Sequence, residues 1–405
     1  MIRTIVTRFP NLEVGMFAGL LFYFERIRRD LRVTRGQLGW KFISTSLLNY
    51  QPQEGEATFN VGGGKWDQHG HQSNVEIGQV CSLNLVQQDH DFLANRKWLA
   101  ELFELVCAND VWGKRISGHP FNLRELMTAM TVRHADNPLL VLHWLALAFC
   151  GIFENLKSGG KLREVFDPPM LLASVKELEP ELLEQFQEVL GEPVVDNFAE
   201  LCRQARNTIQ TQGQIASEAI DRALDLGRTA KVWVESIGAA VRVIEVISDS
   251  VKTGPVARSR GYQVIIQHNG SGHCQIHGGG IRQGGQRQQV DFGRLVNALR
   301  LQEAEARGRR LNISFDRTAS GPMVYSDGTL GEWYFHECRT FIGNGTLSSK
   351  DGVEPTRLSR QRIFNIVVRA LPNCEAVIQE DTGARRRESV VPASSRMEFL
   401  EGAWG

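Results

Sequence analysis

The sequence predicts an α/β protein with a parallel-sheet N-terminal domain, a helical connector and a smaller α+β C-terminal domain. Three observations support this prediction. A β-branched run, Ile2–Thr7, is followed by a loop and an apolar helical segment, Phe17–Arg28, which is the order that opens an α/β unit. A long stretch with helical periodicity runs from Glu177 to about Ser250. Beyond it, short strands separated by turn residues alternate with amphipathic helices.

In the first domain, expected over residues 1–157, a second strand at Ala57–Val61 runs directly into Gly62-Gly63-Gly64. Asn122 is suited to cap a helix, because Glu125 stands three residues later at the spacing of a capping box. Apolar spacing predicts three helices in the second half of this domain, over Leu99–Val106, Phe121–Met130 and Pro138–Phe153.

The remainder of the chain is expected to form a helical connector over residues 158–255, a second domain over 256–375 and a flexible tail over 376–405. Turn residues at Asn269–Gly272 separate two apolar runs and predict a β-hairpin. The predicted elements of the second domain are strands at Tyr262–His268, His273–His277 and Trp333–Phe335, and helices at Val290–Glu305 and Gln361–Ala370.

Length and composition limit the possible classes of protein. At roughly 150 residues per domain, 405 residues allow two or three domains. The apolar fraction of 42% and the charged fraction of 23% are ordinary for a globular protein, and they argue against a disordered or fibrous chain. Lys+Arg and Asp+Glu both number 46, so any attraction to nucleic acid or membrane requires a local basic patch.

The expected location is the cytoplasm, with no membrane contact. We find no apolar run of about 18 residues of the kind that forms a membrane helix, and no secretory signal at the N-terminus. The 7 cysteines are irregularly spaced and include no C-x-x-C pair, which favours reduced thiols over a disulfide framework. The sequence leaves the oligomeric state open.

Acidic and imidazole side chains follow several of the predicted elements. Glu13 comes after the first strand, Asp67 and His69 after the glycine-rich strand end, and Asp110 after a helix. In an α/β sheet, ligands bind outside the carboxyl ends of the strands. Oxygen ligands with an occasional imidazole suit Mn²⁺ or Mg²⁺, which would activate water and hold a phosphoryl oxygen. We therefore predict metal ligands at Glu13, Asp67, His69 and Asp110, with catalytic roles for the last three.

A second glycine cluster suggests a substrate-binding loop. Gly278, Gly279 and Gly280 could leave backbone N–H groups free for an anion, and Arg282 and Arg287 add positive charge. The spacing does not match G-x-x-x-x-G-K-[ST], so this is no P-loop. Either the loop binds phosphate, or it is a hairpin that needs glycine for its backbone angles.

The first domain resembles the DHH phosphoesterases. The segment Arg8–Glu13, before a buried helix, is similar to their His-x-Asp-x-Asp motif. Asn60–Gly64 with Asp67–Gly70 resembles their Asp-x-Gly-Gly … Asp-His-His segment, and Asn109-Asp110 is similar to a further Asp. The second domain fits the DHH-associated domain in outline. The resemblance implies metal-dependent hydrolysis of a phosphoester in a nucleotide or short oligonucleotide bound across a cleft.

Several residues depart from this pattern. The leading His of the motif is absent, and Arg8 stands near its place. Asn11 and Glu13 replace two Asp residues of the motif. Asn60 replaces the Asp before the glycines, and Gln68 replaces the central His. A two-metal site needs bridging carboxylates, and these replacements remove negative charge. Two functions therefore stay open. One is a Mn²⁺- or Mg²⁺-dependent hydrolase acting on a phosphorylated small molecule or short oligonucleotide. The other is a catalytically degenerate homologue that binds a nucleotide, nucleic acid or protein.

Overall fold

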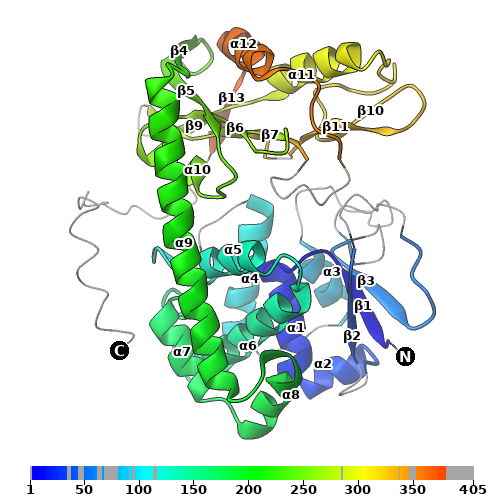
Figure 1. Ribbon diagram of the computed structural model, residues 1–405. Helices are drawn as coiled ribbons and strands as arrows, with labels where there is room; N and C mark the ends of the chain where they lie inside the picture. The colour runs from blue at the N-terminus through cyan, green and yellow to red at the C-terminus, as the bar shows by residue number, and fades with distance from the viewer. Residues whose placement is uncertain are drawn as a thin grey trace. The chain divides into compact units, whose positions relative to one another are not determined.

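The α/β layout predicted from the sequence is present in the computed structural model (Figure 1). The chain divides into two compact units, Met1–Gln210 (unit 1) and Thr211–Gly405 (unit 2). Each unit is described by itself below. The structure describes residues 2–33, 38–43, 50–61, 66–67, 81–90, 92–93, 96–112, 116–283, 286–336, 338–345 and 353–379.

Unit 1 contains a parallel three-stranded sheet of order β2-β1-β3. The central strand β1 (Thr4–Thr7) pairs with β2 (Gly39–Phe42) and β3 (Glu56–Phe59). The β-branched run at the start of the chain therefore forms the predicted strand. The apolar segment after it forms α1 (Leu12–Tyr23) and α2 (Glu25–Asp30), which are separated at Phe24, where the backbone is extended.

The core of unit 1 is built around α6 (Pro138–Lys157), which packs along α1. Two glycines on α1 permit this close approach. A Cβ atom on Gly19 would lie 2.8 Å from Cβ of Phe149, and one on Gly15 would overlap the side chain of Leu145. α6 is long and apolar enough to cross a membrane by length and composition alone, but 78% of that apolar window is buried within this fold.

The other helices of unit 1 cover this core. The predicted cap at Asn122 is confirmed, because its side chain accepts hydrogen bonds from the backbone N–H groups of Arg124 and Glu125. The prediction that a helix ends before Asp110 is wrong, because the apolar spacing continues and the helix includes that residue. These helices are α3 (Ser82–Asp89), α4 (Lys97–Trp112), α5 (Leu123–Arg133), α7 (Pro168–Lys176) and α8 (Pro180–Leu190).

Unit 2 contains a seven-stranded mixed sheet of order β10-β11-β12-β7-β6-β5-β4. The predicted hairpin is confirmed as the antiparallel pair β6 (Val264–His268) and β7 (Cys274–Gly278). Strands β8 (Ile281–Gln283), β9 (Gln286–Val290) and β13 (Ala376–Gln379) form a smaller sheet. The remaining elements are β10 (Gly321–Val324), β11 (Leu330–Phe335), β12 (Phe341–Asn344), α10 (Thr253–Ser259), α11 (Gly293–Ala306), α12 (Arg360–Ala370) and the 3-10 helix η1 (Leu371–Asn373).

The helical pattern predicted up to about Ser250 is wrong beyond α9 (Val194–Asp225). Two strands, β4 (Thr229–Val234) and β5 (Ala239–Ile247), occupy the remainder of that stretch. Gly227 has φ +65, a conformation that ends helices and favours glycine. In β4 the buried residues Val232 and Val234 alternate with exposed ones, which is the period of a strand.

Helices pack on both faces of the large sheet, and α9 covers part of one face. One face packs against α11 and α12. On the other face, Ala219, Ile220 and Ala223 of α9 pack against Ile244 and Val246 of β5. Earlier in the same helix, the ring of Phe198 stacks on Trp144 of α6, with ring centroids 5.9 Å apart. The boundary between the two units therefore falls within one continuous helix.

Candidate functional site

The central strand and one outer strand of the parallel sheet place polar residues at the same end of the sheet. Thr7 and Phe59 are register partners in β1 and β3, so the residues that follow them leave the sheet at the same edge. Asn60 has φ +58, and its backbone N–H donates to the carbonyl of Trp66 at 2.8 Å. This contact brings Asp67, which is 1% exposed, back to the same strand end.

Asp110 on α4 lies against the segment after β1. Its Oδ1 accepts from Nη2 of Arg8 at 3.5 Å and from Nδ2 of Asn11 at 3.3 Å. The Oδ1 of Asn11 in turn accepts from the backbone N–H of Val14 at 2.8 Å, which caps α1. The side chains of Arg8 and Asp110 are 25% and 14% exposed, so this ion pair remains accessible to a ligand.

Glu13, in the first turn of α1, is fully buried beside this pair. One carboxyl oxygen accepts from the backbone N–H of Leu83 at 2.9 Å, and the other accepts from the side-chain amide of Asn60. Burial raises the pKa of Glu13 to about 8; the negative charge of Asp110 also raises it, while Arg8 lowers it. Glu13 is therefore mostly neutral at pH 7 and does not contribute a full negative charge.

The structure thus brings together Arg8, Asn11, Glu13, Asn60 and Asp110, which we call the strand-end cluster. Among the predicted metal ligands, Glu13 and Asp110 belong to it, and Asp67 lies at the same sheet edge. His69 is outside the described residues, as are Gly62–Gly64 and Gln68. The sequence did not indicate the part played by the N–H of Leu83, because that contact depends on how α3 packs.

The cysteine spacing also did not predict a covalent link close to this cluster. Cys81, which precedes α3, and Cys107 of α4 form a disulfide, with Cα atoms 5.5 Å apart. For this pair the expectation of reduced thiols is wrong. The other five cysteines, Cys150, Cys202, Cys274, Cys338 and Cys374, are free as expected.

The described residues of the cluster do not fit a two-metal centre. Both oxygens of Glu13 already accept hydrogen bonds, and its carboxyl is mostly neutral. Asp110 is paired with the guanidinium of Arg8, which supplies positive charge where a divalent ion would lie. Among the residues placed by the structure, no group of three His, Cys, Asp or Glu side chains could hold a metal ion. Two bridged divalent ions need more negative charge than this set provides.

The backbone N–H groups in the glycine loop of unit 2, Gly278–Gly280, are not arranged as predicted. The N–H of Gly278 donates to the carbonyl of Thr340 at 2.7 Å, and that of Gly279 donates to the carbonyl of Gln263 at 2.6 Å. The expectation that both groups are free to bind an anion is therefore wrong. The reason is that β7 continues its backbone pairing up to this turn.

These glycines instead leave room for arginine side chains. A Cβ atom on Gly279 would lie 3.2 Å from Cδ of Arg258, and one on Gly280 would overlap the side chain of Arg287. Desolvation, and then the positive charge of Arg287, lowers the pKa of Arg258. The two arginines are therefore close enough to repel each other. The side chain of Arg282 lies outside the described part, so Arg287 is the predicted substrate-binding arginine that the structure places here.

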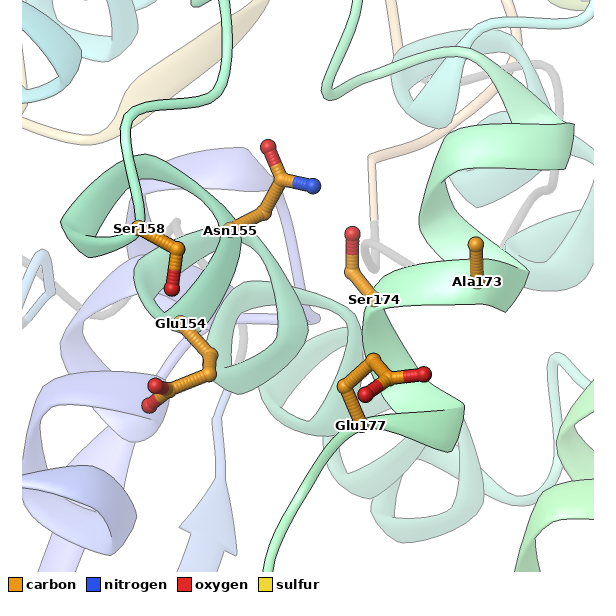
Figure 2. A pocket seen from close by; sticks show the side chains of 6 residues that line it. All are labelled: Glu154, Asn155, Ser158, Ala173, Ser174 and Glu177. Carbon is orange, nitrogen blue, oxygen red and sulfur yellow. The ribbon is translucent and has the colours of Figure 1, made fainter.

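A pocket of about 320 Å³ lies between the end of α6 and α7 in unit 1 (Figure 2). Its lining includes Glu154, whose carboxylate accepts from the hydroxyl of Tyr23 and from Lys157. None of the residues predicted to form a site lines this pocket. We assign this pocket no function.

Comparison with known proteins leaves the family open. No family model and no curated protein matches the chain. A solved structure described as an uncharacterized protein from Helicobacter pylori G27 is similar, with 11% identity and a TM-score of 0.22. The match covers 92% of this chain and 100% of that one. A likeness at this level carries no argument about function, which therefore has to come from the residues of the site.

Proposed function

We propose that the protein is a catalytically degenerate, DHH-like protein that binds a phosphorylated small molecule or the phosphorylated end of a short oligonucleotide. The proposed site is the strand-end cluster of unit 1. One observation carries the proposal: the guanidinium of Arg8 lies at the carboxyl edge of a parallel sheet, where α/β proteins bind their ligands.

The hydrogen bonds of Arg8 leave room for an anion. A guanidinium has five N–H donors in a planar fork, which matches two oxygens of a phosphate. Within the described residues, Arg8 contacts an acid through Nη2 alone, at 3.5 Å. A phosphate could therefore take the remaining donors without first breaking a tight bidentate pair.

The local charge also favours a monoanionic or dianionic ligand. The N-terminus of α1, capped by Asn11, contributes the positive end of a helix dipole. The neutral Glu13 adds little opposing charge at pH 7. The charge of Asp110 is offset by Arg8. The cluster is thus much less acidic than its count of carboxyl groups suggests.

A second candidate function is metal-dependent phosphoester hydrolysis. One observation favours it: the buried oxygens Oγ1 of Thr7 and Oδ1 of Asn60 have no hydrogen-bond partner among the described residues. Both lie at the strand ends and are of the oxygen type that Mn²⁺ and Mg²⁺ prefer. In that case the proposed ligands are Glu13, Asp67, His69 and Asp110.

The degenerate-binder proposal predicts that Arg8→Gln weakens phosphate recognition. The ligand is a 5′-phosphorylated dithymidine, compared with its unphosphorylated counterpart by calorimetry. We expect a loss of about 10- to 150-fold in affinity for the phosphorylated form, since a hydrogen bond to a charged group contributes about 1.5–3 kcal/mol. Arg163→Gln is the control, because Arg163 is exposed beyond the C-terminal end of α6. Equal affinity for both ligands in the native protein would contradict the proposal.

A Mn²⁺ titration separates the two candidate functions. The degenerate binder should show no heat of binding up to millimolar Mn²⁺, because the cluster lacks the charge for a metal centre. Asp67→Ala is measured alongside, with Asp136→Ala as an exposed acidic control in unit 1. Tight binding that Asp67→Ala loses and Asp136→Ala keeps would reject the degenerate binder in favour of the hydrolase.

A further inference from the structure

We propose that the outer face of the β4–β5 hairpin in unit 2 binds single-stranded nucleic acid. A base would stack on Trp233, while phosphates contact Lys231 and Arg242. With Ala240, these three residues form what we call the hairpin surface. It belongs to unit 2 and shares no residue with the strand-end cluster, so the inference does not depend on the proposed function.

The geometry of the hairpin leaves an indole ring open to solvent. β4 is an edge strand of the large sheet (Figure 1). Trp233 is 59% exposed, and its register partner on β5 is Ala240, whose small side chain leaves the ring uncovered. On the same face, α9 covers Ile244 and Val246 further along β5. The exposed ring therefore lies on the part of this face that the α9 contacts do not reach.

Two basic residues are neighbours of Trp233 in the register of the hairpin. Lys231 and Arg242 are register partners across the hairpin, and both are exposed. Like charges directly opposite each other destabilise a sheet. Within the described residues, neither side chain contacts a carboxylate. A ligand that carries negative charge could therefore pair with both side chains without displacing a carboxylate.

The guanidinium of Arg242 is already held in place. It lies over the ring of Tyr262, 4.3 Å from the centroid, and its Nη1 donates to the carbonyl of Arg260 at 3.2 Å. Its remaining donors stay available. Lys231 and Trp233 are two residues apart on one strand, or about 7 Å. A flat aromatic ring with basic groups at that distance is the arrangement that binds unpaired bases and their phosphates.

Other occupants fit this surface less well. A membrane would require a wider apolar area, but the alternate residues Val232 and Val234 face the core. An acidic peptide would use the two charges without needing the exposed ring. Single-stranded nucleic acid uses both features, because every base has a face that can stack, whatever the sequence.

The test uses the full-length chain and a fluorescein-labelled 15-nucleotide oligothymidylate, with binding followed by anisotropy. Trp233→Ala should weaken binding about 5- to 150-fold, the range expected for losing one stacked base, and Trp233→Phe should retain most of it. The affinity falls with salt, and Lys231→Gln should make the slope of log affinity against log salt less steep by about 0.7, the value for one phosphate contact. Leu330→Ala and Arg310→Gln serve as exposed controls near the opposite edge of the sheet.

Three results would overturn the inference. One is the absence of binding at roughly 0.1 mM protein, the weak end of non-specific affinity. Another is binding that Trp233→Ala leaves unchanged while its far-ultraviolet circular dichroism remains native. The third is preferential binding to vesicles of anionic phospholipid, with loss in Trp233→Ala, which would assign the surface to membranes instead.

Discussion

Gly15→Ala should destabilise unit 1 by about 1–3 kcal/mol, the usual cost of overpacking a filled core. The added methyl group would overlap the side chain of Leu145, and the parallel packing of α1 on α6 leaves no free space on that side. A gain in helix propensity of about 1 kcal/mol opposes this cost but does not cancel it. Thermal and urea unfolding, followed by circular dichroism, measure the change.

The matched control is the same substitution at a helical glycine with open surroundings. A Cβ atom on Gly213 of α9 would meet nothing within 4 Å. Gly213→Ala should therefore stabilise the protein by up to about 1 kcal/mol, through helix propensity alone. The double substitution Gly15→Ala/Leu145→Ala should be less destabilising than the sum of its parts. Leu145→Ala makes room for the new methyl group, which in turn fills part of the cavity left by the leucine. Equal effects of Gly15→Ala and Gly213→Ala would show that the α1–α6 contact is looser than described.

Glu13→Gln should remove a large pH dependence of stability. Burial raises the pKa of Glu13 in the folded protein to about 8, whereas the ordinary value is 4.5. Between these values the unfolded chain releases a proton that the folded chain retains, so the free energy of unfolding falls as pH rises. The effect is absent below the lower value, where both states are protonated. At about 1.4 kcal/mol per pKa unit, the loss across the window is on the order of a few kcal/mol.

Glutamine can replace the protonated Glu13 without loss of its hydrogen bonds. It keeps one acceptor for the N–H of Leu83, and Asn60 can rotate its amide to offer the Oδ1 that now lacks a partner. The free energy of unfolding is measured with urea at about pH 5 and about pH 8.5. Relative to the native protein, Glu13→Gln should be more stable at the higher pH than at the lower one. Glu101→Gln, an exposed acid on α4, should leave the native slope unchanged. If the free energy of unfolding of Glu13→Gln depends on pH as strongly as that of the native protein, the titrating group is not Glu13.

The strands and helices that sequence predicted best are those with a strong local pattern. The β-branched run before Arg8, the hairpin around Asn269–Gly272 and the cap at Asn122 each depend on neighbouring residues, and each is found as predicted. The β4–β5 hairpin was not predicted, because Arg and Glu residues among its valines give a spacing of apolar and charged residues that resembles that of a helix. Gly227, which stops α9, was the local signal that could have revealed it.

The sequence predicted that some of the candidate residues lie close together, but it could not predict their charge or hydrogen bonds. Sequence order placed Glu13, Asp67 and Asp110 after elements whose ends could meet, and Glu13 and Asp110 do lie close together. It could not show that Glu13 is buried against Asn60 and the N–H of Leu83, which changes its charge. Likewise, it could not show that the N–H groups of Gly278 and Gly279 donate to the carbonyls of Thr340 and Gln263. Contacts of this kind are set by tertiary packing.

The continuity of α9 bears on how these two units can be separated in evolution or in the laboratory. Domain borders usually fall in exposed linkers, where a cut leaves the backbone hydrogen-bonded to water. Here the border lies between Gln210 and Thr211, inside the helix, and a cut there would expose new unpaired N–H and C=O groups on both fragments. A gene fragment that encodes either unit must therefore carry α9 whole. Recombination is expected to transfer this chain as one module.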